Sequence, residues 1–180
     1  MAKLYDFPDP EIYRFEADEV VPNSDLPLLI YRQPSDDGRD LERHFKSLFA
    51  EHGWTKAWTD TIFDYDHFHA EAHEVLGIAR GRARVRFGGQ QGKEIEVTEG
   101  DVIAIPAGVA HKRLSGSHDL TVVGAYAEGR DYDMRRPDEV RDIEVWEHKA
   151  DRVPLPHQDP VYGELGPLRF LWNKGPARQM

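Results

Sequence analysis

The sequence reads HFHAEAHE over residues 67–74 and GDVIAIPAGVAH over residues 100–111. In an extended chain, side chains two residues apart share a face, so His67 and His69 present two imidazoles to one side. A carboxylate from Glu74 and a third imidazole from His111 complete a mixed nitrogen and oxygen set that suits a first-row transition metal. The two stretches therefore predict four ligands of one divalent metal ion, held inside a small β-barrel.

These side chains also have plainer interpretations. One buried histidine is usually satisfied by hydrogen bonds, but three at this spacing favour a metal. Glu74 leads a predicted strand with two aliphatic residues in its own phase, and a carboxylate facing that interior needs a cation as partner. His73 points to the opposite face if strand alternation holds, which places it behind the ligands. The loop at residues 70–73 breaks that alternation, so a swapped set with His69 and His73 as ligands stays an alternative.

Composition limits the class of protein. The chain has 180 residues, which predicts one domain with its own hydrophobic core. It has no cysteine, which excludes disulfides, thiolate zinc sites and cysteine nucleophiles. A formal net charge of -10 argues against nucleic acid and against anionic lipid as partners. The first residues lack the apolar core of a signal peptide, and no run reaches membrane-spanning length, so we expect a cytoplasmic protein.

Most of the chain has the pattern of short strands. A period of two begins at Trp58 and predicts a strand over 58–69 that carries Tyr65, His67 and His69 on one face. Many short strands with regular turns are typical of an all-β sandwich or barrel. The other strands are predicted over 26–31, 74–78, 82–87, 94–97, 102–105, 112–114 and 120–126.

One helix is predicted before the barrel strands. Residues 41–52 repeat apolar side chains at helical spacing, which indicates an amphipathic helix that covers part of the barrel. Asp40 is suited to cap its N-terminus, and Gly53 is suited to end it. A second, shorter helix is predicted around residues 138–147. The apolar stripe of the first helix consists of Leu41, Phe45, Leu48 and Phe49.

The chain is predicted to form one domain with three parts. Residues 1–57 hold an N-terminal arm, an edge strand and the helix. Residues 58–130 form the barrel core. Residues 131–180 form a C-terminal extension, which is rich in proline but carries enough apolar side chains to pack on the barrel.

The two stretches resemble the paired motifs of the cupin family. The first motif is HxH, four residues, Glu, six residues and Gly, and it matches His67, His69, Glu74 and Gly81. The second is Gly, five residues, Pro-x-Gly, two residues, His, three residues and Asn, and it matches Gly100, Pro106, Gly108 and His111. Thr61 stands where the first motif usually opens with Gly, and Ser115 stands where the second usually ends with Asn. These departures fall on turn and support positions and leave the ligands intact.

A wider resemblance is to the YjlB-type bacterial cupins. It rests on HEVLG at 73–77, PAGVAHKRL at 106–114, VVGAY at 122–126 and DPVYG at 159–163. The resemblance implies a jelly-roll barrel, a bound divalent metal, a small-molecule ligand and a homodimer. It implies no particular reaction.

Three further residues are candidates for catalysis or for support of the metal. Tyr65 is in phase with His67 and would line the pocket or donate a proton. Arg113 shares a face with His111 and would bring a guanidinium near the metal. His73 is the third. Four protein ligands around an octahedral ion leave two positions open, and Fe, Mn, Ni and Zn all suit the set.

Two classes of function follow. The leading hypothesis is a metal-dependent enzyme, dioxygenase-like or an isomerase/lyase, that acts on a small oxygen-bearing molecule. The alternative is a non-catalytic protein that senses or stores a metal or a small ligand, and a third is a scaffold with a vestigial site. An acid or base pointing into the cavity from Tyr65, His73 or Arg113 would favour catalysis.

Overall fold

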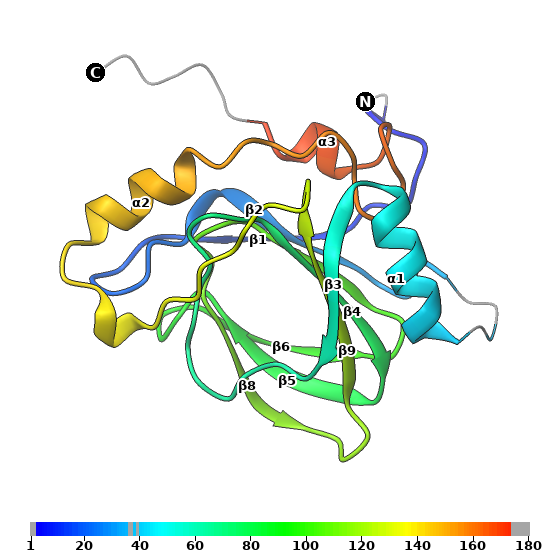
Figure 1. Cartoon of the computed structure of the whole chain (residues 1–180), viewed down its shortest axis with the longest axis horizontal. Coiled ribbons are helices and arrows are strands. Elements are labelled where there is room, and N and C mark those ends of the chain that lie inside the picture. The colour runs from blue at the N-terminus through cyan, green and yellow to red at the C-terminus, as the bar shows by residue number, and fades with distance from the viewer. Residues whose placement is uncertain (1–2, 36–37, 39, 174–180) are drawn as a thin grey trace.

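Two antiparallel sheets face each other across the interior (Figure 1). The computed structural model describes residues 3–35, 38 and 40–173, so the ends of the predicted arm and extension and part of the loop at 34–38 lie outside the described residues. One sheet has the order β1-β2-β7-β4-β9-β3 and the other β6-β5-β8. The strands are β1 Glu11–Phe15, β2 Ser24–Tyr31, β3 Trp54–Asp60, β4 Glu74–Arg80, β5 Arg82–Phe87, β6 Lys93–Thr98, β7 Val102–Ile105, β8 His111–Gly116 and β9 Thr121–Ala127. The predicted all-β class is confirmed.

Alternation along the strands divides the core into two layers. On β4, Leu76 and Ile78 face the space between the sheets, where they meet residues of β5 and β6. Val75 and Ala79 face the opposite side of the six-stranded sheet, which the helices cover. Because β4 is buried on both faces, a polar residue in the phase of Leu76 must point into the barrel interior. Glu74 has that phase.

The helix α1, Leu41–Glu51, begins and ends at local signals. The Asp40 side chain accepts a hydrogen bond from the backbone N–H of Arg43, which caps the first turn. Gly53 follows the last turn with φ +79°, a left-handed conformation that favours glycine. Both terminal residues were named from the sequence, because capping depends on local chemistry alone.

The apolar face of α1 packs on the outer side of the six-stranded sheet. Phe45 and Phe49 are fully buried there and stack with their ring centroids 5.5 Å apart. A side chain at Gly77 would begin 2.5 Å from the Phe45 ring. Glycine in the middle of β4 therefore lets the helix approach the sheet closely.

The strand predicted over 58–69 is wrong from residue 61 onward. β3 ends at Asp60, and the chain then follows an irregular path to β4. Its backbone groups pair with distant segments instead of one strand ladder: His67 exchanges hydrogen bonds with His111 at 3.2 and 2.9 Å, and Phe68 does so with Arg135 at 2.9 Å. These isolated bridges keep the residues around Phe68 extended.

Two other segments differ from the sequence prediction. The N-terminal arm contains β1, which pairs with β2 and widens the sheet by one strand. The helix predicted around 138–147 is α2, Ile143–Asp151, and a 3-10 turn, Pro137–Glu139, occupies the start of the predicted range. The Asp142 side chain accepts from the N–H of Glu144 at 3.1 Å, so the helix begins at this cap.

The described part of the C-terminal segment lies against the outer layer of the core (Figure 1). It includes the short helix α3, Leu168–Leu171. Trp172 is buried against the sheet, and its Nε1 donates a 2.7 Å hydrogen bond to the carbonyl oxygen of Pro27. A contact between residues so distant in sequence closes the outer layer.

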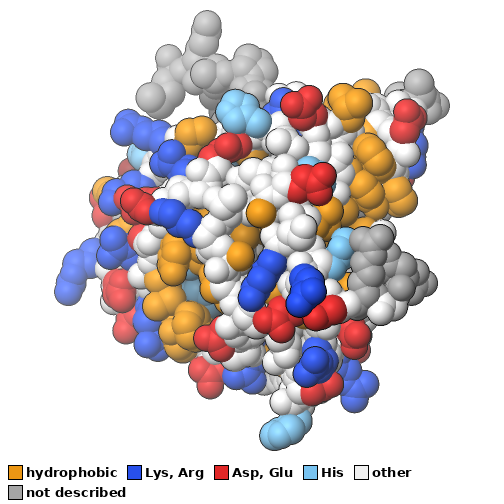
Figure 2. Space-filling model, turned by 45° about the vertical axis from the view of Figure 1, so that its right-hand side comes forward, with side chains coloured by type: hydrophobic (Ala, Val, Ile, Leu, Met, Phe, Trp, Pro, Cys, Tyr) orange, Lys and Arg blue, Asp and Glu red, His pale blue; other side chains and the backbone are white. Residues whose placement is uncertain are grey.

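Charges of both signs are mixed over the face shown in Figure 2, and hydrophobic side chains form small groups between them. Arg84 and Glu94 form an exposed cross-strand pair at 3.4 Å. None of the helices in the described part of the chain has both the length and the apolar character that a membrane span requires.

Candidate metal centre

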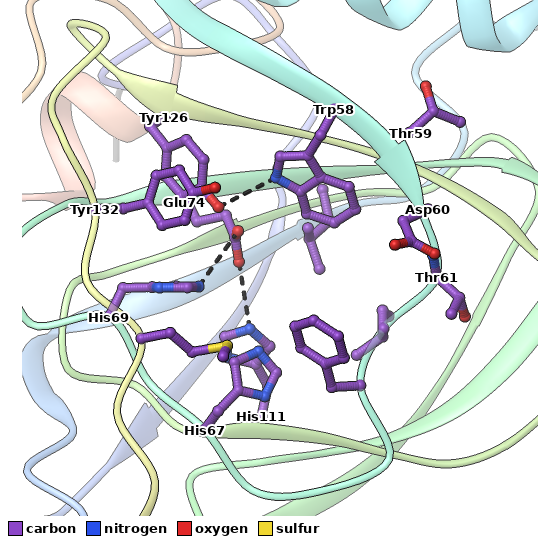
Figure 3. Close-up of a pocket in the computed structure, with 14 residues that line it drawn as sticks. Trp58, Thr59, Asp60, Thr61, His67, His69, Glu74, His111, Tyr126 and Tyr132 are labelled. Atoms are coloured by element: carbon purple, nitrogen blue, oxygen red, sulfur yellow. Dashed lines mark hydrogen bonds and ion pairs between the residues drawn. The ribbon is translucent and has the colours of Figure 1, made fainter.

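Four buried side chains from three parts of the fold meet in the barrel interior (Figure 3). His67 and His69 come from the irregular segment after β3. Glu74 is the first residue of β4, and His111 is the first residue of β8 in the other sheet. All four line a cavity of about 330 Å³. The structure therefore brings together the residues that the two sequence motifs single out.

The ligand atoms of these side chains converge. One ring nitrogen of each histidine lies within 4.8 Å of those of the other two. The Glu74 carboxylate lies beside them, with Oε2 3.4 Å from His69 Nε2 and Oε1 3.3 Å from His111 Nε2. Metal–ligand bonds of about 2 Å place donor atoms at separations of this order around one ion.

Hydrogen bonds fix which nitrogen of each ring faces the cluster. Each Nδ1 lies on a backbone carbonyl oxygen, which only accepts, so each Nδ1 carries a proton. The pairs are His67 with Tyr65 at 3.1 Å, His69 with Asp133, and His111 with Val109 at 3.1 Å. In a neutral ring the Nε2 then offers a lone pair. At His69 and His111 this lone pair faces the Glu74 carboxylate, and two acceptors so close require a proton or a metal ion between them.

The electrostatics of the cluster favour a bound cation. Burial, with a smaller contribution from the neighbouring His111, lowers the pKa of His67 to about 3, so this ring is neutral at physiological pH. Burial also lowers the pKa of His69, but the charge of Glu74 outweighs it and the net shift is upward. Burial raises the pKa of Glu74, yet His69 and His111 hold it well below its usual range. A charged carboxylate is thus buried among imidazoles.

Two of the further candidates lie outside the cavity lining. Tyr65 stacks on Phe63 at 5.0 Å, and the Arg136 guanidinium lies 4.1 Å from the centre of the Tyr65 ring. Arg113 donates from Nε to the carbonyl oxygen of Ile62 at 2.9 Å. Neither residue lines the cavity, which corrects the expectation based on phase. For Tyr65 the reason is that the chain leaves regular strand geometry after β3. Arg113 lies within β8, next to a register shift with β5, and its side chain turns to the Ile62 carbonyl.

His73 is buried behind the candidate ligands. Its Nδ1 accepts a 2.8 Å hydrogen bond from the N–H of Ala107, and its ring lies 4.9 Å from that of Trp172 in the outer layer. The swapped set of His69 and His73 does not fit this geometry, because the His73 ring is held on the other side of the sheet from the cavity.

Tyr126 and Trp58 form an inner wall that the sequence analysis did not assign to the site. Tyr126 stands opposite Glu74 in the pairing of β9 with β4, and Trp58 Nε1 donates to its hydroxyl at 3.1 Å. The indole crosses Gly124, where a Cβ would lie 2.2 Å from the ring. Burial and the charge of Glu74 raise the pKa of Tyr126, so its hydroxyl keeps its proton. The strand predicted over 120–126 could have revealed Tyr126, because alternation along that strand points its side chain into the barrel.

The mouth of the cavity is apolar and partly exposed. Phe63, Tyr132 and Met134 line it, with 43%, 49% and 42% of their surfaces exposed. Tyr132 stacks on Tyr126 with ring centroids 4.1 Å apart and planes 12° apart. Tyr132 and Met134 lie in an irregular segment with no periodic pattern, so no sequence signal pointed to them.

Asp133 links the segment that contains Tyr132 and Met134 to the loop at residues 70–73. Its Oδ1 accepts hydrogen bonds from the N–H groups of Ala70 at 2.8 Å and Glu71 at 3.0 Å. Its backbone carbonyl receives the Nδ1 proton of His69. One residue therefore orients a candidate ligand and holds the cavity mouth in place.

The class of protein follows from comparison with known families: residues 66–129 match the family described as Cupin. Within that class, the chain belongs to the YjlB-type cupins. It is 40% identical over 167 residues to a protein of Bacillus subtilis (strain 168) described as uncharacterized protein YjlB. The match covers 91% of this chain and 97% of that protein.

Two solved structures resemble the fold over about half of the chain. An acireductone dioxygenase from Bacillus anthracis, with a cadmium ion in its active centre, is 15% identical with a TM-score of 0.38, covering 55% of this chain and 77% of that one. The QdtA 3,4-ketoisomerase from Thermoanaerobacterium thermosaccharolyticum, a double mutant in complex with TDP, is 18% identical with a TM-score of 0.40, covering 55% and 74%.

Proposed function

We propose that this chain is a metal-dependent enzyme that binds one divalent transition metal through His67, His69, Glu74 and His111. The observation that carries the proposal is the set of three Nε2 atoms converging beside a charged, buried carboxylate. Facing acceptors in a buried site are costly without a cation. A mixed nitrogen and oxygen set suits Fe, Mn, Ni or Zn.

The substrate class that fits is a small oxygen-bearing molecule. When bound, the ion would supply Lewis-acid polarisation, or oxygen-dependent chemistry if it is iron, which corresponds to an isomerase/lyase or to a dioxygenase-like reaction. Tyr126 holds a proton at its hydroxyl beside the cluster, because Trp58 donates to that oxygen and burial keeps the phenol protonated. It is the residue placed to hydrogen-bond a substrate oxygen or to deliver a proton.

The alternative is a protein that senses or stores a metal or small ligand without catalysis. The observation that favours it is that Tyr65, His73 and Arg113 do not line the cavity. Tyr126 counts against it, because a protonated phenol beside four candidate ligands is more than binding requires. Replacing Tyr126 by Phe separates the two functions: an enzyme loses turnover with its metal retained, whereas a storage protein is unchanged.

Elemental analysis of the purified protein tests the metal site. We expect one divalent ion per chain in the wild type and none in His67→Ala or His111→Ala, with the circular dichroism of the fold retained because the barrel has its own core. His118→Ala, in an exposed turn, is the matched control and should keep its metal. Wild-type metal content in His67→Ala would refute the assignment.

Other expectations from the sequence remain proposals. These are a homodimer, a cytoplasmic location, and the division of the single domain at residues 57/58 and 130/131. Light scattering of the purified protein measures the oligomeric state.

A further inference from the structure

The walls of the cavity have a chemical character distinct from its floor. The floor is the cluster of three histidines and Glu74, whereas aromatic rings make up much of the wall (Figure 3). Within the described part of the chain, the residues that line the cavity include no lysine and no arginine. The aromatic lining residues are Trp58, Phe63, Tyr126 and Tyr132.

The charge of this site selects against phosphorylated ligands. Three neutral imidazoles and one carboxylate would leave a divalent ion with a net charge of about +1. A monoanion bound at the ion neutralises the charge of this cluster, whereas a phosphate monoester dianion overshoots it and also meets Asp60, the other carboxylate of the lining. Besides metal ions, proteins hold phosphate groups with arginine, lysine or a helix N-terminus, and the lining supplies no arginine or lysine to add to the ion.

The mouth presents a flat aromatic surface. Tyr132 is stacked on Tyr126 and still half exposed, so an open ring face or edge meets whatever enters. Phe63 and Met134 are exposed beside the same cavity. The hydrogen bonds of Asp133 to Ala70 and Glu71 hold the Tyr132 segment in place before any ligand arrives.

The size of the cavity sets a further limit. Its volume of about 330 Å³ lies at the lower end of the range of roughly 300–1,000 Å³ for ligand pockets. A single ring with one polar head group fits inside a cavity of this size.

We infer that the cavity takes a small monoanionic molecule with a planar, unsaturated body, such as an aromatic carboxylate, and that Tyr132 is the residue that selects the planar body. The anionic head points toward the histidine cluster and the ring lies along the wall of Tyr132 and Phe63. This inference rests on the proposed metal site, because the ion supplies the positive charge on the floor.

Calorimetric titration of the zinc-loaded protein tests the inference with three probes. Benzoate has the predicted head and body, cyclohexanecarboxylate keeps the charge but not the flat ring, and phenyl phosphate keeps the ring but changes the head. We expect benzoate to bind, and each of the other two to bind about tenfold more weakly or not at all. Tyr132→Ala should weaken benzoate binding about tenfold, whereas Tyr132→Phe, which keeps the ring, should stay close to wild type.

The outcomes separate the two proposals. Zinc that fails to bind, or that binds equally to His67→Ala, refutes the metal site itself. The inference about the ligand is overturned if zinc binds to the wild type and not to His67→Ala, but benzoate gives no heat or all three probes bind with equal affinity. In that outcome the metal site itself still stands. Equal benzoate affinity in the wild type and in zinc-retaining Tyr132→Ala overturns the role of Tyr132.

Discussion

The Tyr31 hydroxyl donates a 2.6 Å hydrogen bond to Oδ2 of Asp159, and both side chains are buried. Asp159 also accepts from the backbone N–H groups of Val161, Tyr162 and Leu168 at 2.8 to 3.0 Å. Four donors thus satisfy this fully buried carboxylate. The pair joins β2 to the C-terminal segment on the outside of the barrel.

Replacing Asp159 by Ala should destabilise the fold by about 3 kcal/mol or more, because it leaves buried donors unpaired. Tyr31→Phe should cost less, about 1–2 kcal/mol, since the backbone donors still satisfy the carboxylate. Chemical denaturation measures both values. Tyr5→Phe removes a hydrogen bond from an exposed pair with Asp9 and is the control that should change stability little. Equal stability of Asp159→Ala and wild type would contradict this account.

The contrast between this pair and the metal site shows what the sequence could reveal. The four candidate ligands were found because their spacing combines a local period of two with turn glycines that close hairpins. The helix caps at Asp40 and Gly53 were found for a similar reason, since both act within one turn. The hydrogen-bonded pair of Tyr31 and Asp159 has no such sequence signature, because the two residues lie 128 positions apart.

The cavity was harder to predict than the four candidate metal ligands. Tyr126 had a readable phase on a predicted strand, but Tyr132 lies in an irregular segment where alternation has no meaning. Arg113 was placed in the pocket because it shares a face with His111, and Tyr65 by extending strand alternation past Asp60. The backbone there pairs with β8 and with Arg135 instead of a neighbouring strand, so the phase was lost.

Arg86 is predicted to position His67 through an ion pair. Its Nη2 lies 2.6 Å from Oδ2 of Asp66, the residue before His67, and both side chains are largely buried. Arg86→Leu should destabilise the protein by about 3 kcal/mol, because it leaves a carboxylate without its partner. It should also weaken zinc binding, which competition with a chromophoric chelator measures.

Arg84→Leu is the matched control on the same strand. Its ion pair with Glu94 is exposed, so the loss should be below about 1 kcal/mol and zinc affinity should be unchanged. If the two substitutions had the same effect on zinc affinity, Arg86 would have no positioning role.

Asp133→Ala is predicted to weaken metal binding without removing a ligand. The substitution deletes the acceptor for the N–H groups of Ala70 and Glu71, and the loop that carries His69 loses its support. Loss of such supporting partners typically lowers metal affinity about 10–100-fold. Asp131→Ala, two residues earlier and fully exposed, should leave the affinity unchanged. Equal affinities of the two variants would exclude the role given to Asp133.

The metal-free protein should lose stability on mild acidification because of His67. Its pKa is lowered from 6.5 to about 3, so below pH 6.5 the unfolded chain takes up a proton here that the folded chain does not. The free energy of unfolding should then fall as the pH drops, by at most about 1.4 kcal/mol per pH unit from this group. Glu74, with its pKa lowered from 4.5, adds its own loss only below that pH. His69, with its pKa raised above 6.5, contributes a stabilisation already complete below pH 6.5.

The interval between pH 6.5 and 4.5 therefore isolates His67 from its two neighbours. Urea unfolding in the presence of a chelator, repeated across this interval, should give a shallower fall for His67→Asn than for the wild type, since asparagine does not titrate and can still donate to the carbonyl of Tyr65. His118→Asn, at an exposed position, should follow the wild-type curve. Parallel curves for wild type and His67→Asn would mean that the His67 ring accepts a proton in the folded state. That result would contradict the neutral His67 imidazole that the proposed metal site requires.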